Sequence, residues 1–147
     1  MYQSDYNMIT LKENTITVKD YLKIRSRVGW IELKEEQATK ALENSLYVVG
    51  AYDGDQLVGM GRIVGDGAVI CYVQDLIVIP DKQHTGIGSM VLEKLMQYVE
   101  SLRIEKSQMM LCLMCAKGRE SFYEQHGFIA RPTDNLGPGM IQYLRDY

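Results

Sequence analysis

A glycine-containing segment at residues 83–89 has the residue types and spacing of a phosphate-binding loop. It follows an apolar run that ends at Pro80 and precedes a stretch with helical spacing of apolar residues. Glycine allows close approach of the backbone to a ligand and a positive φ, and a helix start offers free N–H groups and the positive end of its dipole. These features predict a pyrophosphate site that needs no metal ion, with Lys82 and His84 adding positive charge at its rim. The loop residues are Gln83, His84, Thr85, Gly86, Ile87, Gly88 and Ser89.

Two nucleotide-binding motifs have glycines at similar spacing, but the neighbouring residues do not match them. A Walker loop requires a lysine directly after the second glycine, where this chain has Ser89. A dinucleotide-binding fingerprint requires a third glycine, where this chain has Val91. A glycine-rich helix cap that binds no ligand is the simplest remaining alternative.

The elements that must position the loop follow from the periodicity of apolar residues and from turn residues. We expect strands at residues 7–11, 46–52, 56–64, 68–79, 108–116, 128–131 and 140–144, and helices at residues 17–28, 34–44, 86–102 and 118–126. Thr17 and Asp20 resemble a capping box at the first helix, and Gly29 is expected to end that helix. This order predicts one mixed α/β (α+β) domain over residues 1–147, with a mainly antiparallel sheet and a single β-α-β crossover.

Composition excludes several classes of partner. The 147 residues carry a net charge of −3, which offers no basic surface for nucleic acid or for an anionic membrane. An odd number of cysteines without a secretory segment indicates a reducing compartment, so a cytoplasmic location is expected. Cys112 and Cys115 form an isolated CxxC inside an apolar run, which favours core cysteines over a zinc or redox site, and no metal is expected.

Three motifs together resemble the GNAT superfamily of acyl-CoA-dependent N-acetyltransferases. The family pattern Gln/Arg-x-x-Gly-x-Gly/Ala is matched by residues 83–88, and its strand end Leu-x-Val-x-Pro by residues 76–80. Its Phe-Tyr-x-x-x-Gly-Phe element is matched by residues 122–128. The resemblance extends over nearly the whole chain, although the N-terminal helices and the C-terminal end match in layout only.

The resemblance implies a fold, a co-substrate and a set of roles. The fold would be a GNAT-type sheet with splayed middle strands and flanking helices, and acetyl-CoA would enter the gap. Backbone groups of Leu76, Ile77 and Val78 would pair with the pantetheine arm as an added strand would. Backbone N–H groups of residues 84–89 would hold the pyrophosphate. The N–H of Val78 would polarise the thioester carbonyl, and Tyr123 would be the general acid for the departing thiolate.

The resemblance does not identify a general base. The family places it four or six positions before the valine that corresponds to Val78, and those positions here are Gln74 and Tyr72. Neither is a good base at neutral pH, and regular alternation turns the adjacent Asp75 to the other face of the strand. A water chain through Tyr72 and Gln74 to a carboxylate, or entry of an amine that is already neutral, would remove the proton. His84 and His126 receive no catalytic role.

The best-supported activity is acetylation of a primary amine of a small molecule, with no nucleic acid or membrane partner. Acetylation of a protein or peptide amine, or a non-catalytic acyl-CoA-binding sensor, are the alternatives, and pairing of two copies as a homodimer stays open. The amine pocket is expected between the N-terminal helices and the C-terminal strands. Trp30 would be a pocket wall or, more commonly for a lone tryptophan, a core residue.

Overall fold

The computed structural model describes residues 8–146. These residues divide into two compact units, with the boundary between Cys112 and Leu113. Among the helices of the described residues, none is long and apolar enough to cross a membrane.

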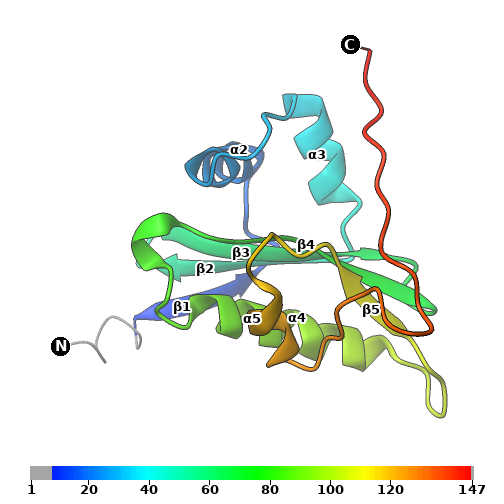
Figure 1. Ribbon diagram of the computed structural model, residues 1–147. Coiled ribbons are helices and arrows are strands. Elements are labelled where there is room, and N and C mark those ends of the chain that lie inside the picture. Colours follow the sequence, from blue (N-terminus) through cyan, green and yellow to red (C-terminus); the bar gives the residue numbers. More distant parts are fainter. Residues whose placement is uncertain (1–7, 147) are drawn as a thin grey trace. The chain divides into compact units, whose positions relative to one another are not determined.

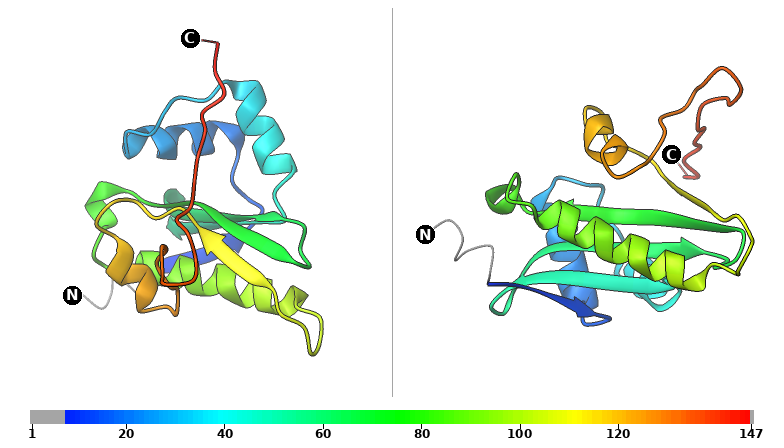
Figure 2. Two further views of the ribbon diagram at one scale, coloured as in Figure 1. Left: turned by 45° about the vertical axis from the view of Figure 1, so that its right-hand side comes forward. Right: turned by 90° about the horizontal axis from the view of Figure 1, so that it is seen from below.

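The first unit is a sheet with helices on both faces. The sheet has the strand order β1-β2-β3-β4-β5, and β1 to β4 pair antiparallel in succession. Helices α2 and α3 cover one face, and α4 lies along the opposite face (Figures 1 and 2). The elements are β1 (Ile9–Glu13), α2 (Val18–Arg27), α3 (Glu35–Glu43), β2 (Tyr47–Asp53), β3 (Gln56–Gly65), β4 (Ile70–Val78), the 3-10 turn η1 (Pro80–Lys82), α4 (Ile87–Leu102) and β5 (Met110–Leu113).

Helix α2 begins and ends where the sequence predicts. The Thr17 hydroxyl accepts a hydrogen bond from the Asp20 N–H at 3.1 Å, which satisfies one of the free donors of the first turn. Past the last turn, Gly29 has a φ of 71°, a conformation that glycine adopts without a Cβ penalty. Only Tyr21 and Ile24 of this helix are buried, so its inner face is narrow.

Helix α4 packs tightly on the sheet because β3 has a glycine beneath it. Its apolar stripe, buried against the sheet, comprises Ile87, Val91, Leu92, Leu95 and Val99. A Cβ at Gly61 would lie 2.6 Å from Leu95 Cδ1 and 3.0 Å from Val91 Cγ1, closer than real Cβ contacts allow. The absence of a side chain at residue 61 therefore sets how near α4 comes to the strands.

Strand β4 contains a bulge at Asp75. The register with β3 changes from Met60↔Ile77 to Arg62↔Gln74, so two residues of β4 lie opposite the single residue Gly61. Asp75 has a φ of 55°, in the left-handed region that aspartate tolerates better than most residues. The extra residue breaks the alternation of side chains along the strand.

The second unit contains one short helix, α5 (Glu120–Glu124), and otherwise irregular chain. Two predictions are wrong here, because neither 128–131 nor 140–144 forms a strand in the described residues. Their apolar residues resembled strand patterns, but a strand requires a partner to receive its hydrogen bonds, and neither segment has one. The local bonds are those of turns, such as Thr133 N–H to Leu136 O at 2.8 Å.

Candidate active site

The end of β4 presents backbone groups that no strand of the first unit pairs with. The Ile79 N–H donates to Val58 O at 3.0 Å, and Ile77 pairs with Met60, so residues 77 and 79 direct their backbone groups toward β3. Because direction alternates along a strand, Leu76 and Val78 direct theirs to the opposite edge.

Strand β5 is too short to cover that edge along the whole of β4. Its first residue, Met110, donates to Val69 O at 3.0 Å, beside the start of β4, and β5 has only four residues. Within residues 8–112, β5 therefore accompanies only the first part of β4. Within these residues, no strand pairing uses the N–H of Val78, and its pairing with a ligand stays a prediction.

The predicted phosphate loop folds back onto the same strand end. The Gln83 side chain donates from Nε2 to Val78 O at 3.0 Å, which fixes the start of the loop beside β4. His84 and Gly86 both have positive φ, 64° and 92°, and Gly86 is the N-cap of α4. Thr85 closes the turn with a hydrogen bond from its hydroxyl to Lys82 O.

The first turn of α4 leaves its N–H groups without helical partners. The first bond of the helix runs from Met90 N–H to Gly86 O at 3.1 Å. The N–H groups of Ile87, Gly88 and Ser89 therefore have no helical carbonyl four residues earlier to accept a bond. No acidic residue lies in this turn. The predicted rim charge of Lys82 is partly engaged, because its Nζ lies 3.2 Å from a carboxylate oxygen of Asp53.

A buried charge cluster lies under α2, on the face opposite α4. The Asp75 carboxylate is 3% exposed and accepts hydrogen bonds from Arg25 Nη1 at 2.8 Å and from Arg62 Nε at 2.7 Å. The Tyr21 hydroxyl also donates to it. Burial, followed by the hydrogen bond to Asp75, raises the pKa of Tyr21, so this residue is a neutral donor at ordinary pH.

Aromatic rings hold the Arg25 guanidinium in place. Its central carbon lies 5.7 Å from the ring centre of Tyr21 and 5.3 Å from that of Trp30. Trp30 is 39% exposed, so the expectation of a core position is wrong. Its indole is instead partly exposed beside Arg25, an arrangement that cation–π attraction favours, and it lines neither of the two pockets described below.

A pocket of about 530 Å³ opens beside this cluster, between α2, α3 and the middle strands. Its wall is formed by Tyr21, Arg25, Leu33, Gln37, Lys40, Ala41, Arg62 and Gln74. Gln74, one of the two positions predicted for the base, therefore faces this pocket. The other, Tyr72, pairs with Val64 two residues earlier in β4 and shares the same face of the sheet.

The expectation that Asp75 faces away from Gln74 is wrong. Gln74 Nε2 lies 3.4 Å from Asp75 Oδ1, and both side chains lie on the side of α2. The bulge is the physical reason, because its left-handed residue turns the Asp75 side chain out of the regular alternation. Leu76, next in the chain, resumes the pattern on the face of α4, where its Cδ1 lies 3.5 Å from the position of a Cβ on Gly61.

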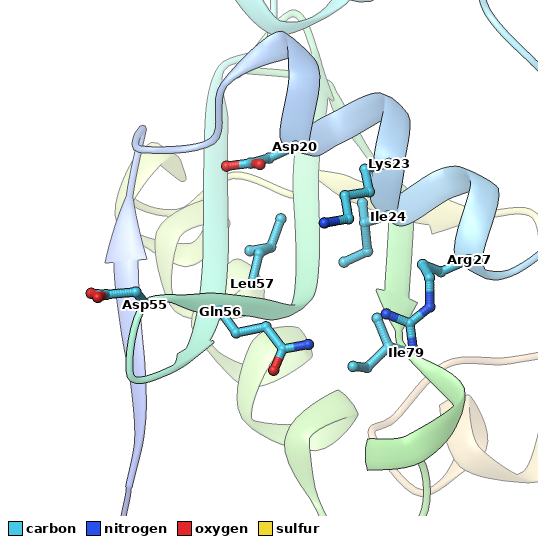
Figure 3. Close-up of a pocket in the computed structure, with 8 residues that line it drawn as sticks. All are labelled: Asp20, Lys23, Ile24, Arg27, Asp55, Gln56, Leu57 and Ile79. Carbon is cyan, nitrogen blue, oxygen red and sulfur yellow. The ribbon is translucent and has the colours of Figure 1, made fainter.

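A second and smaller pocket, of about 150 Å³, lies toward the other end of α2 (Figure 3). Ile24, Leu57 and Ile79 form its apolar part, and both acidic and basic side chains surround them. Arg27, which also lines it, is 3.5 Å from the carboxylate of the exposed Asp81. Its mixed charge gives it no clear preference for a ligand.

In the second unit, Tyr123 is held among aromatic rings. Its ring centre lies 5.0 Å from that of Phe122 and 5.9 Å from that of Phe128, in edge-to-face contacts. Burial, with a smaller effect of Cys115, raises the pKa of Tyr123 to about 12. His126 Nδ1 lies 2.9 Å from Phe122 O, so this ring is tied to the backbone at the helix end.

The described residues contain no group of three or more His, Cys, Asp or Glu side chains placed to hold a metal ion. Within residues 8–112, the geometry comprises a strand edge at Leu76 and Val78, a glycine-capped helix start and a pocket beside α2 and α3. The model of the acetyltransferase (GNAT) domain matches residues 43–130, which is more than half of the chain. This chain belongs to the GNAT acetyltransferases. The family generally uses acetyl-CoA as the acetyl donor.

Solved acetyltransferase structures agree with this assignment over more than nine tenths of the chain. A probable acetyltransferase of unknown function from Staphylococcus aureus is 31% identical with a TM-score of 0.81, and the match covers 92% of this chain and 100% of that one. A GNAT family acetyltransferase from Streptococcus pneumoniae is 33% identical with a TM-score of 0.79, covering 95% and 100%. An uncharacterized ycf52-like N-acetyltransferase of Prochlorococcus marinus is 28% identical over 134 residues, or 88% of this chain and 72% of the relative.

Sequence analysis missed the partners of Asp75. Arg62 and Asp75 are opposite charges inside two apolar strands joined by one turn, and that was the available signal. Charged residues in such positions are rarely buried unless they are paired. The third partner, Tyr21, gave no signal of its own, because a tyrosine on the apolar side of a helix is ordinary.

Proposed function

We propose that this GNAT protein transfers an acetyl group from acetyl-CoA to a primary amine of a small molecule. The free backbone edge at Leu76 and Val78, next to the glycine-capped start of α4, carries the proposal. This part of the protein combines an unpaired strand edge with a helix start that suits an anion. Acyl-CoA has the matching parts, an extended amide arm followed by a pyrophosphate. The protein or peptide acceptor and the non-catalytic sensor are the competing functions.

The residues present fit acetyl-CoA. Leu76 and Val78 would bind the pantetheine amides, while Ile77 would keep its ladder with Met60. The N–H groups from residue 84 to residue 89 would hold the pyrophosphate, helped by the dipole of α4. Bound acetyl-CoA supplies an activated acetyl thioester. The N–H of Val78 would donate to the carbonyl oxygen, where negative charge develops.

Tyr123 would donate a proton to the leaving thiolate. The amine nitrogen forms a bond to the acetyl carbon, the carbon–sulfur bond breaks, and the departing sulfur takes a proton from Tyr123 Oη. The nitrogen releases one proton to solvent water, and Tyr123 regains one from solvent, so the products are the amide and the free thiol of CoA. A pKa of about 12 keeps that proton on Tyr123 throughout the usual assay range. Because general acids work best when their pKa is near the working pH, we expect a contribution at the lower end of the usual range, about 10²-fold.

The amine would enter the site neutral. Gln74 cannot accept a proton usefully, and both oxygens of Asp75 are engaged by Tyr21, Arg25 and Arg62. We therefore expect kcat/KM to rise with pH until the free amine is deprotonated. Tyr123 causes no alkaline decline below about pH 11, because its pKa is raised to about 12.

The test begins with the co-substrate. Saturating acetyl-CoA should raise the thermal midpoint, because a ligand that binds only the folded state stabilises it, whereas NADH and ATP at equal concentration should have less effect. Free-thiol release would then be followed across amines, amino acids, polyamines and peptides. An unchanged midpoint with acetyl-CoA would refute the proposal, and tight binding without any turnover would favour the sensor.

A further inference from the structure

We propose that the pocket between α2 and α3 binds an oxyanion of the acceptor, so that the substrate is a small amine that also carries a carboxylate or a phosphate. This inference rests on the proposed function and specifies its substrate class. It reverses the expectation from the whole chain, whose net charge of −3 would favour cationic molecules. The local charge of the pocket, and not that total, acts on a bound ligand.

The pocket wall is cationic. Arg25, Lys40 and Arg62 all line it, and no aspartate or glutamate does. Asp75 lies behind the wall and neutralises one charge of the two arginines that contact it. The remaining acid nearby, Glu36, is 4.0 Å from Lys40, and both side chains are largely exposed, so that pair is weak.

Two guanidinium nitrogens, one on each arginine, have no hydrogen-bond acceptor among the described residues. Arg62 uses Nε on Asp75 and Nη1 on Ser45, and its Nη2 donates to no acceptor within residues 8–146. Among the described side chains, Arg25 Nε is the buried polar atom without a hydrogen-bond partner. Buried polar groups are normally satisfied, so the unpartnered Arg25 Nε beside the pocket points to a missing acceptor, while Arg62 Nη2, which is not buried, can donate to a ligand in the pocket.

The arginines are held in fixed positions before any ligand arrives. Asp75 fixes both of them, Tyr21 and Trp30 flank Arg25, and Ile31 O accepts from Arg25 Nη2 at 3.1 Å. A fixed guanidinium suits an oxyanion because its remaining donor, Nη2 of Arg62, and the Lys40 ammonium can each give a charge-assisted hydrogen bond to a ligand oxygen. Less side-chain entropy is then lost on binding.

The pocket also lies at a usable distance from the proposed reaction centre. Gln74 lines it, and Val78 lies farther along β4; their partners on β3, Arg62 and Gly59, are three residues apart, which corresponds to roughly 10 Å at the usual strand rise. An amine and an acid separated by an extended side chain fit this spacing. The volume of about 530 Å³ is within the range of small-molecule sites.

The experiment uses pairs of amines that differ only in the oxyanion: lysine against cadaverine, and glucosamine 6-phosphate against glucosamine. Turnover is measured by thiol release, and binding by NMR line broadening of each amine with the protein saturated in CoA. The acidic member of at least one pair should have a kcat/KM at least tenfold higher. The carboxylate and phosphate arms identify the source of the oxyanion.

Variants of Lys40 assign the effect to the pocket. Lys40→Gln and Lys40→Glu should weaken binding and turnover of the acidic amine about threefold and tenfold respectively, with a smaller effect on the neutral amine, so that the preference for the acidic amine falls while the acetyl-CoA midpoint shift is kept. Lys19→Glu is the matched control, since Lys19 is exposed on α2 and does not line the pocket.

The inference is overturned if neutral amines bind as well as their acidic partners, if Lys40→Glu keeps the preference, or if acidic peptides outcompete every small amine. Failure of the proposed function shows differently. In that case acetyl-CoA fails to bind or no amine is acetylated, while the NMR measurement still determines whether the pocket binds oxyanions.

Discussion

Replacing Asp75 with asparagine should strongly destabilise the fold. The change keeps the size of the side chain and its tolerance of a left-handed backbone, so it removes little besides the charge. Arg25 and Arg62, whose side chains are 12% and 11% exposed, then lose their common counter-charge. Removing one partner of a buried ion pair typically costs about 3–5 kcal/mol, because the other charge stays buried.

The loss should be measured by urea unfolding, followed by fluorescence and circular dichroism. For a chain of this size, a loss of that amount lowers Tm by roughly 10–15 °C. Asp81→Asn is the control, because its pair with Arg27 is 3.5 Å long and Asp81 is 78% exposed, and such pairs contribute about 0–1 kcal/mol. If Asp75→Asn costs no more than Asp81→Asn, the cluster does not stabilise the fold as a buried ion-pair network.

The remaining predictions concern the loop, the proposed acid and a turn. Gly86→Val should weaken acetyl-CoA binding at least tenfold by calorimetry, whereas Gly67→Val, which has a similar positive φ of 73° but lies outside the loop, should leave it unchanged. Tyr123→Phe should lower kcat and kcat/KM about 10²-fold with unaltered CoA affinity, and full turnover would make Tyr123 a packing residue. Asp66 accepts three backbone N–H bonds, which lower its pKa, so its stabilisation is complete above about pH 4 and is lost as the pH falls further. Asp66→Asn should therefore make unfolding free energy less pH-dependent between about pH 5 and pH 2.

Local signals in the sequence predicted most of the first unit. The Thr17 cap, the glycine at residue 29 and the apolar stripe of α4 each act within a few residues, and each lies where expected. The glycine turn before α4 was predictable for the same reason, because its glycines and the following helix start are adjacent in the chain, and its binding of pyrophosphate stays a prediction. Even so, the link from Gln83 to Val78 O became visible only in three dimensions.

Features that depend on distant partners were not predictable. The prediction of two C-terminal strands was wrong because an apolar segment shows strand propensity without showing whether a neighbouring strand is present to pair with it. The bulge was not predicted because regular alternation is the default expectation for a strand, and the extra residue is defined only by the register with β3. The pocket was unrecognised for the same reason, since its cations come from α2, α3 and β3.

The bulge in β4 also has an evolutionary consequence. Before the bulge, the side chains of even-numbered residues face α2, and after it those of odd-numbered residues do. Asp75 is therefore one extra residue in an otherwise regular strand, as the insertion of a single codon would produce. A chain that lacked this residue would keep all the remaining residues of β4 on the faces where they now lie. The anchor of the two arginines can therefore be gained or lost by the insertion or deletion of a single residue.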